Sequence, residues 1–157
     1  MLLCYSNNEK IRIQAASGGF ISSLLMYLLE KQLIDGAICV KQDNENPLLN
    51  KVFIAKNSDQ ILETLGSRYS PSSNCTALES IIINPGKYAF VGKPCEIEAL
   101  CNLEKKLPIL GKRIIFKIGL MCHHTPTRQA LNSIINDYKV NKYKIKDLKF
   151  RGNGWPG

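Results

Sequence analysis

Two cysteines follow apolar stretches of the chain, in positions suited to chemistry. Cys95 occurs in the run FVGKPCEIEAL and Cys122 in the run KIGLMCHHTP. A cysteine in the first turn of a helix has its thiolate stabilised by the helix dipole, which suits nucleophilic attack or metal ligation. Because the carboxyl ends of neighbouring strands share one edge of an α/β sheet, the two thiols could converge there. Three roles stay open for Cys95: an inert packed thiol, a nucleophile and a metal ligand.

A catalytic Cys-His pair is the competing interpretation of the same region. It would be built from Cys95 or Cys122 with His123 or His124. Cys122 and His123 are adjacent, however, and on an extended segment adjacent side chains face opposite sides, so the two are poorly placed to share a proton. Cys101 lies six residues after Cys95, which is about 600° around a helix, so it faces another side and is predicted to be a packed thiol.

The use of cysteine as a whole argues against a disulfide framework. The chain has six cysteines but no C-x-x-C pair, so a self-contained zinc ribbon or ferredoxin pattern is not expected. Its start, MLLCYSNNEK, does not resemble a signal peptide, and no apolar run is long enough for a membrane span. We therefore expect a cytoplasmic protein whose thiols are free or bound to metal. Cys39, inside the apolar run GAICV, is predicted to be a small buried hydrophobe.

Two further motifs could bind an anionic or flat ligand. Ser17, Gly18 and Gly19 open a predicted helix, where bare backbone N–H groups and the helix dipole can seat a phosphate. The same motif also caps helices that bind nothing. The loop GSRYSPSS, which begins at Gly66, adds hydroxyls, an arginine and a tyrosine that could clamp a phosphate and cover a heterocycle. An ordinary surface loop with a buried Tyr69 is the alternative.

The elements that must position these residues alternate between strand and helix. Apolar alternation and flanking turns predict strands over 36–40, 51–55, 88–92, 113–121 and 145–150, and 3.6-residue periodicity predicts helices over 17–31, 58–65, 76–83, 94–107 and 125–138. Met26, Tyr27 and Phe116 are expected in the core. The fold class that follows is α/β, a layered mixed sheet with flanking helices in a single domain.

The net charge of +8 is concentrated near the end of the chain. Residues 1–111 carry 11 Lys or Arg and 11 Asp or Glu, whereas residues 112–157 carry 10 and 2. Such a surface could dock an acidic protein or bind a polyanion. The lysines of KVNKYKIKDLKF alternate with apolar residues, which indicates instead a solvated edge strand.

The order of these motifs is more specific than any one of them. The runs IRIQAASGGFISS, GSRYSPSS, YAFVGKPCEIEAL, KIGLMCHHTP and FRGNGWPG follow one another along nearly the whole chain. In this order they resemble the coenzyme F420 hydrogenase/dehydrogenase beta-subunit family. The resemblance implies FAD, a 4Fe-4S cluster and an electron-transfer role. Because members are usually considerably longer, we expect residues 1–157 to be a flavin-binding and iron–sulfur-associated domain, a fragment of a longer protein.

The resemblance also assigns expected site residues. Near the flavin it implies the Ser-Gly-Gly residues and a Gly-Ser-Lys-Tyr motif in which arginine replaces lysine, that is, Ser17, Gly18, Gly19, Gly66, Ser67, Arg68 and Tyr69. The family's Gly-Thr-Pro-Cys corresponds to Gly92, Lys93, Pro94 and Cys95, with lysine in place of threonine. Cys122 matches the end of its Gly-Leu-x-Cys strand, and Arg151, Gly154 and Trp155 match its last motif. Cys95 and Cys122 are thus the implied metal ligands, two of the four that a cubane cluster needs.

These expectations define a redox domain and one alternative. The domain would transfer electrons between a deazaflavin or ferredoxin-type donor, bound FAD and an iron–sulfur cluster, with a ferredoxin or a hydrogenase or dehydrogenase subunit as partner. The alternative is a non-catalytic α/β interaction module that docks an acidic redox partner or polyanion through the basic end of the chain. Nucleic acid is not an expected partner, except as one polyanion that the alternative module could bind.

Overall fold

Four strands form one mixed sheet at the centre of the fold. The computed structural model describes residues 2–122 and 124–151. The strand order is β2-β1-β3-β4, with β1 at Gly36–Gln42, β2 at Asn50–Ala55, β3 at Tyr88–Gly92 and β4 at Ile114–Gly119. The neighbouring strands β1, β3 and β4 are parallel, and β2 joins the edge antiparallel to β1 through a short turn. The predicted mixed α/β sheet is therefore confirmed.

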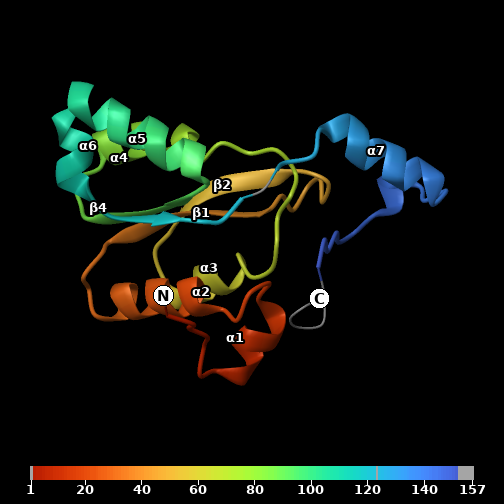
Figure 1. Ribbon diagram of the computed structural model, residues 1–157, viewed down its shortest axis with the longest axis horizontal. Helices are drawn as coiled ribbons and strands as arrows, with labels where there is room; N and C mark the ends of the chain where they lie inside the picture. The colour runs from red at the N-terminus through yellow and green to blue at the C-terminus, as the bar shows by residue number, and fades with distance from the viewer. Residues whose placement is uncertain (1, 123, 152–157) are drawn as a thin grey trace.

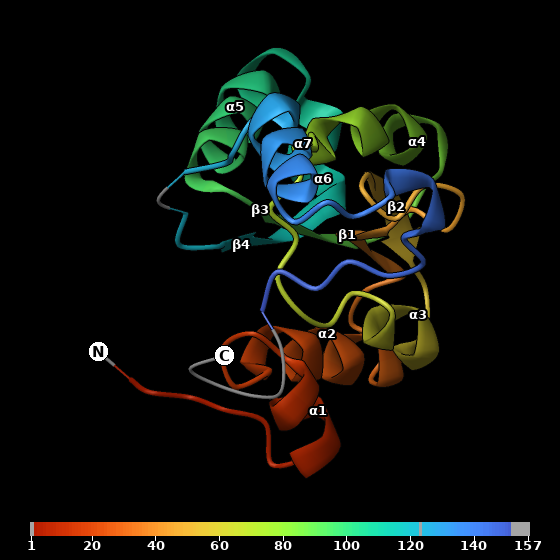
Figure 2. The same cartoon turned by 90° about the vertical axis from the view of Figure 1, so that its right-hand side faces the viewer.

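Helices cover both faces of the sheet (Figure 1). On one face lie α1 (Glu9–Gln14), α2 (Phe20–Glu30) and α3 (Ser58–Leu62). On the other lie α4 (Leu78–Ile83), α5 (Pro94–Lys106) and α6 (Pro108–Arg113), with the 3₁₀ helix η1 (Asn74–Ala77) leading into α4. Figure 2, turned by 90°, shows the same two helical layers on opposite sides of the strands. The result is a three-layer arrangement that buries β3 and the first part of β1, whereas most of the edge strand β4 stays exposed.

Alternation along β1 and β3 divides the interior into two cores. Odd-numbered residues of both strands face α2 and α3, and even-numbered residues face α4, α5 and α6. The first core contains Leu25, Leu28, Ile34, Ala37, Cys39, Ala55, Ile61, Ala89 and Val91. The second contains Ile38, Leu78, Ile81, Tyr88, Phe90, Leu100, Leu110 and Ile114. Burying a side chain such as Phe90 contributes about 1.5–3 kcal/mol, so these layers hold the sheet and helices together.

The last part of the chain packs differently. Helix α7 (Arg128–Asp137) and the 3₁₀ helix η2 (Lys142–Lys144) follow β4 and lie beyond one end of the sheet (Figure 1). The strand predicted over 145–150 is wrong, because this segment pairs with neither edge of the sheet. Without a neighbouring strand, its alternating lysines face solvent along an irregular backbone.

Several smaller expectations are also corrected. The helix predicted from Ser17 begins at Phe20, because Gly18 and Gly19 adopt left-handed backbone angles. Tyr27 is 52% exposed and Phe116 37% exposed, so neither belongs to the core, whereas Met26 packs against it. The short helices α1 and α6 were not anticipated, since runs of six residues leave little periodicity to read. None of the described helices is long and apolar enough to span a membrane.

Candidate functional site

A cavity of about 920 Å³ lies beside the carboxyl ends of the parallel strands. Its walls come from the start of α2, from the loop over 64–72, from the end of β3, and from segments after β4 that include residues of α7. In open α/β sheets this edge is the usual place for a ligand. The volume lies within the range typical of cofactor pockets, and the lining is largely apolar with a few polar groups, as such pockets usually are.

The start of α2 forms the first wall. Gly19 is the N-cap residue with φ 74°, and the helix has no side-chain cap at this end. Ser17 and Gly19 line the cavity, whereas Gly18 is not part of its lining. A Cβ at Gly19 would lie 2.8 Å from Cγ2 of Ile11, and a Cβ at Gly18 would lie 3.0 Å from Cβ of Tyr5. The two glycines are therefore required by backbone angle and local packing, and they leave an uncapped helix N-terminus facing the cavity.

The loop that follows α3 forms the second wall. Gly66, Ser67, Arg68 and Tyr69 all line the cavity, so the structure places the whole motif at the site. Arg68 donates from Nη1 to Oε1 of Gln42 at 3.1 Å and to the carbonyl of Leu148 at 3.2 Å. Its Nε is buried and has no hydrogen-bond partner among the described residues. Burial lowers the pKa of Arg68, although nearby Asp147 opposes this, and a guanidinium stays charged at neutral pH.

An aromatic contact closes this wall against the end of the chain. The rings of Tyr69 and Phe150 meet edge to face, with their centroids 5.3 Å apart and an interplanar angle of 74°. Tyr69 is 39% exposed, so the alternative of a buried tyrosine in an ordinary surface loop is not what the structure shows. Phe150 and Arg151 also line the cavity. The contacts that hold the segment after α7 against the loop include this aromatic pair and the hydrogen bond from Arg68 to Leu148.

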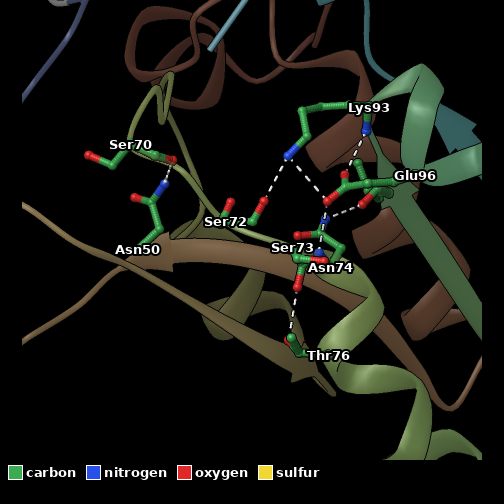
Figure 3. Close-up of polar contacts among 9 residues, drawn as sticks. Asn50, Ser70, Ser72, Ser73, Asn74, Thr76, Lys93 and Glu96 are labelled. Atoms are coloured by element: carbon green, nitrogen blue, oxygen red, sulfur yellow. Dashed lines mark hydrogen bonds and ion pairs between the residues drawn. The ribbon is translucent and has the colours of Figure 1, made fainter. Parts of the chain in front are cut away.

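The turn from β3 into α5 is held by a buried carboxylate (Figure 3). Glu96 is 7% exposed, and its Oε1 accepts a hydrogen bond from the backbone N–H of Asn74 at 2.9 Å. Its Oε2 accepts one from the backbone N–H of Lys93 at 2.9 Å, and the ammonium of Lys93 lies 3.2 Å from Oε1. The same ammonium donates to the carbonyl of Ser72 at 2.9 Å. This junction ties the loop before η1 to the first turn of α5.

Sequence reasoning singled out the residues beside this junction but not its centre. Gly92, Lys93 and Pro94 were all expected near the cofactor. Gly92 and Lys93 line the cavity, whereas Pro94 is not part of its lining. Asn74 and Glu96 also line it, and neither was anticipated. A signal for Glu96 existed, because a glutamate three residues into a helix commonly accepts a hydrogen bond from the N-cap backbone.

The cysteines are distributed unequally around the site. Cys122 lines the cavity, whereas Cys95 is exposed and outside the lining, although each lies three residues beyond the end of its own strand. Leu120 donates its backbone N–H to the carbonyl of Gly92 at 2.8 Å, so the two strand ends remain adjacent. The assignment of Cys95 and Cys122 as metal ligands stays a prediction.

Other thiols and the histidines complete the account. Cys39 is buried as predicted, and burial raises its pKa to about 12. Cys101 is exposed, so its expected role as a packed thiol is wrong. His124 lines the cavity, while His123 lies outside the described residues. The Cys-His alternative therefore stays untested.

A complete iron–sulfur donor set is absent from the part of the chain that the structure describes. Within residues 2–122 and 124–151, no group of three or more His, Cys, Asp or Glu side chains could hold a metal ion. A 4Fe-4S cluster needs four ligands. The described side chains therefore do not fit such a cluster by themselves.

The three-layer fold, with a large cavity at its strand ends, is typical of α/β proteins that bind a cofactor. Comparison with known proteins identifies the family. The N-terminal profile of the coenzyme F420 hydrogenase/dehydrogenase beta subunit matches residues 1–79, and the C-terminal profile of the same subunit matches residues 86–157. The chain belongs to this family.

Individual relatives agree with this assignment. The coenzyme F420 hydrogenase subunit beta of Methanosarcina barkeri is 29% identical over 94% of this chain and 56% of its own length. The F420-dependent formate dehydrogenase subunit beta of Methanocaldococcus jannaschii is 30% identical over 92% of this chain and 38% of its own length. A chain of the F420-reducing NiFe hydrogenase complex from Methanosarcina barkeri superposes with a TM-score of 0.78 at 25% identity, covering 94% of this chain and 52% of that one. The chain thus spans roughly half the length of the hydrogenase relatives.

Proposed function

We propose that this chain is the flavin-binding part of an electron-transfer subunit, and that FAD occupies the cavity at the strand ends. The observation that carries the proposal is the convergence of separate motifs on one space. Side chains or backbone from the Ser-Gly-Gly start of α2, the Gly-Ser-Arg-Tyr loop and the Gly-Lys turn all line the same cavity. Relatives named as subunits of F420-dependent hydrogenase and formate dehydrogenase support a redox role.

The polar groups of the cavity fit a dinucleotide. The uncapped N-terminus of α2 offers free backbone N–H groups and the positive end of a helix dipole to a pyrophosphate. Ser17 adds a hydroxyl at this end, and the unsatisfied buried Nε of Arg68 adds a cationic donor on the facing wall. Both features leave polar groups of the protein without a partner, and an anionic ligand would satisfy them.

The remaining walls suit the flat part of the same ligand. Leu25, Cys39 and Val91 give an apolar floor that excludes water, and Tyr69 offers a ring at the edge. The ammonium of Lys93 is held at the end of β3 by Glu96 and by the carbonyl of Ser72, which fixes one positive charge beside the cavity. When bound, FAD would supply the hydride and single-electron chemistry, while the protein positions the ring and sets its electrostatic surroundings.

The proposal does not extend to a complete iron–sulfur cluster in this chain. The described residues contain no group of three or more donors, so Cys95 and Cys122 would need further ligands to hold a cluster. The names of the relatives support a deazaflavin as donor and a hydrogenase or dehydrogenase subunit as partner. A ferredoxin-type protein is the other donor that we propose, and no relative's name supports it.

A titration with FAD tests the proposal. Ala16 lines the cavity, and Gln14 is an exposed residue two positions earlier that does not. We expect Ala16→Trp to weaken FAD binding about tenfold or more, because an added indole overpacks the ligand space by 1–3 kcal/mol or more. Gln14→Trp should bind FAD like the parent protein. Flavin fluorescence quenching and the visible spectrum report binding, and equal affinity of both variants would count against the cavity as the FAD site.

A docking module is the second candidate function, and one observation favours it. Between the end of β4 and residue 151, large apolar side chains are strongly exposed among lysines, notably Met121 at 100%, Tyr138 at 78% and Tyr143 at 87%. A basic surface with apolar spots suits an acidic protein partner. A chain that takes up no FAD yet binds an acidic ferredoxin, with affinity falling steeply as salt rises, would favour this function over the redox one.

A further inference from the structure

Strand β4 forms an edge of the sheet, and its outer side has no strand beside it among the described residues. The order β2-β1-β3-β4 gives β4 one neighbour, β3 (Figure 2). The opposite edge strand, β2, is half-buried over most of its length, and Nδ2 of Asn50 in β2 donates to the carbonyl of Ser70 at 2.6 Å, which ties a loop to this strand. Most of β4 is exposed instead. The sheet therefore has one partly covered edge and one open edge.

The backbone of β4 directs polar groups toward this open side. Leu120 donates its N–H to the carbonyl of Gly92 at 2.8 Å, and the register of β4 with β3 is regular from Phe116 onward. Because alternate residues of a strand turn their N–H and C=O groups to opposite sides, those of Lys117 and Gly119 point away from β3. An unpaired row of such groups is a template for pairing with another strand.

The side chains of β4 divide between the two faces of the sheet. Lys117 lies on the face that α5 covers, because its ammonium is 2.8 Å from Oε2 of Glu104. Ile118 packs against the core beneath α2, and Phe116, two residues earlier, lies on that same face and is 37% exposed. A lysine on an edge strand commonly keeps other strands away, but the charge of Lys117 is already paired with Glu104. The open edge thus has one polar face and one apolar face.

Positive charge surrounds the polar face. The last turns of α5 and α6 carry two basic residues each, Lys105, Lys106, Lys112 and Arg113. Helix α6 leads directly into β4, and the ion pair of Glu104 with Lys117 brings the end of α5 beside the strand. None of the four basic residues forms an ion pair with a carboxylate among the described residues. Charge complementarity therefore favours an acidic partner over a second copy of this chain, whose net charge is also +8.

We propose that β4 docks an extended acidic segment of a partner protein, which joins the sheet as a fifth strand. The backbone of this segment pairs with Lys117 and Gly119. Its acidic side chains, at alternate positions, meet the basic ends of α5 and α6, and the apolar side chains between them cover Phe116. Main-chain hydrogen bonds supply the affinity in this mode of binding, and the alternation supplies the specificity. Neither Lys117 nor Gly119 lines the cavity, so the surface needs no FAD and goes beyond the proposed function.

A peptide titration of the full chain, without added flavin, tests this surface. The probe is a peptide of about ten residues in which Glu and Val alternate, long enough to pair along the whole strand, and the control peptide has Lys in place of Glu. We expect saturable amide chemical-shift changes and slowed hydrogen exchange at Lys117 and Gly119. The amide of Ile118, which faces β3, should keep its exchange rate. The acidic peptide should bind at least about tenfold more tightly than the basic one at low salt, and added salt should reduce this difference.

Substitutions at Gly119 separate strand pairing from other contacts. Gly119→Pro removes an N–H that points away from β3, and proline is tolerated on the open side of an edge strand. Beyond its chain neighbours, an added Cβ at this position would approach only Ile97, at 4.0 Å. We expect Gly119→Pro to weaken binding of the acidic peptide about tenfold, the loss of one or more main-chain hydrogen bonds. Gly119→Ala keeps the N–H and should bind like the parent.

Phe116→Ser provides a second test that leaves the backbone groups of β4 in place. It should also weaken binding, because the apolar side chains of the peptide would lose their cover. Three results would overturn the proposal: no saturable binding of the acidic peptide, equal binding of the two peptides, or unchanged binding by Gly119→Pro. Slowed exchange at Lys117 and Gly119 that grows with protein concentration, without any peptide, would also overturn it and would identify a second copy of the chain as the occupant.

Discussion

Glu96 combines burial, charge and several hydrogen bonds in one side chain. Its carboxylate accepts from the backbone of Asn74 and Lys93, both at 2.9 Å, and pairs with the ammonium of Lys93. Removing it leaves the buried N–H of Asn74 and the half-buried N–H of Lys93 without their acceptor, and it takes away one of the two partners of the Lys93 ammonium. A residue of this kind matters beyond its own helix, because it fixes the loop that forms one wall of the cavity.

We expect Glu96→Ala to lower the free energy of unfolding by about 2–4 kcal/mol, since buried donors would lose their partner. Glu98, exposed on the same helix, provides the matched control, and Glu98→Ala should change stability by less than about 0.5 kcal/mol. Urea denaturation followed by circular dichroism measures both. Equal small effects of the two substitutions would mean that the junction does not stabilise the fold.

Cys39 predicts a pH dependence of stability. Its pKa is raised by burial from 9.0 to about 12 in the folded protein, so the folded state binds the thiol proton more tightly than the unfolded state does. This contribution is fully present below pH 9 and is lost as pH rises toward the folded pKa, by about 1.4 kcal/mol per pH unit.

The parent protein should therefore lose stability between pH 9 and pH 10.5 faster than Cys39→Ala, although the alanine variant is less stable near neutrality because of its cavity. Cys101→Ala, at an exposed thiol, should follow the parent curve. Urea midpoints measured across this range give the comparison. Parallel curves for the parent and Cys39→Ala would contradict the burial of this thiol.

At the scale of elements, the start of α2 links backbone geometry to the cavity. Gly19 has φ 74°, and an added Cβ would lie 2.8 Å from Ile11, which belongs to α1. The glycine therefore serves the packing of α1 against α2 and, by leaving the helix uncapped, also serves the proposed anion site. The two roles can be separated by measuring stability and ligand binding on the same variants.

We expect Gly19→Ala to cost about 1–3 kcal/mol of stability through backbone strain and steric conflict. It should also weaken FAD binding, because the N–H groups at the helix start would shift. Gly111 is the control, since it lies within α6 and an added Cβ would meet no atom closer than 3.7 Å. Gly111→Ala should be neutral or stabilising by up to about 1 kcal/mol. A Gly19→Ala protein as stable as the parent would contradict the packing argument.

The elements also show what sequence patterns could and could not give. Strands β1 and β3 are short apolar runs between turns, and helix α5 begins at a proline, so their existence and approximate ends could be predicted. The segment 145–150 has the same alternation as an edge strand but no strand beside it, and alternation cannot reveal whether a partner exists. The Ser-Gly-Gly and Gly-Ser-Arg-Tyr motifs were recognisable from residue types. The capping role of Glu96 had a local signal in its position within the helix, but its bond to Asn74 did not, because that contact spans 22 residues.

The whole molecule consists of a three-layer body and a less firmly attached basic end. Outside the segment after β4, helices cover both faces of the sheet, whereas α7 lies beyond the sheet and keeps Ile134 52% exposed (Figure 1). The far end of this segment returns to the body through the ring contact of Tyr69 and Phe150 and the bond from Arg68 to Leu148. These contacts hold the segment against this wall of the cavity.

We expect Tyr69→Ala to speed tryptic cleavage at the lysines between 139 and 149 by about 3–10-fold, because an aromatic pair is worth about 0.5–1.5 kcal/mol against local opening. Tyr143→Ala removes a ring that is 87% exposed in the same segment and should leave the cleavage rate near that of the parent. Timed digestion with mass spectrometry identifies the sites. Identical rates for all three proteins would show that the aromatic contact does not hold the segment.

The central claim is that one cavity at the strand ends receives FAD, and amide chemical shifts measured during an FAD titration test it most directly. The account predicts saturable shifts at Ser17, Gly19, Gly66, Ser67 and Gly92, which line the cavity, and none at Gly86 and Gly111, which do not. Shifts confined to the basic segment over 139–149, or no saturable shifts at FAD concentrations up to roughly 1 mM, an affinity of only about 4 kcal/mol, would contradict it.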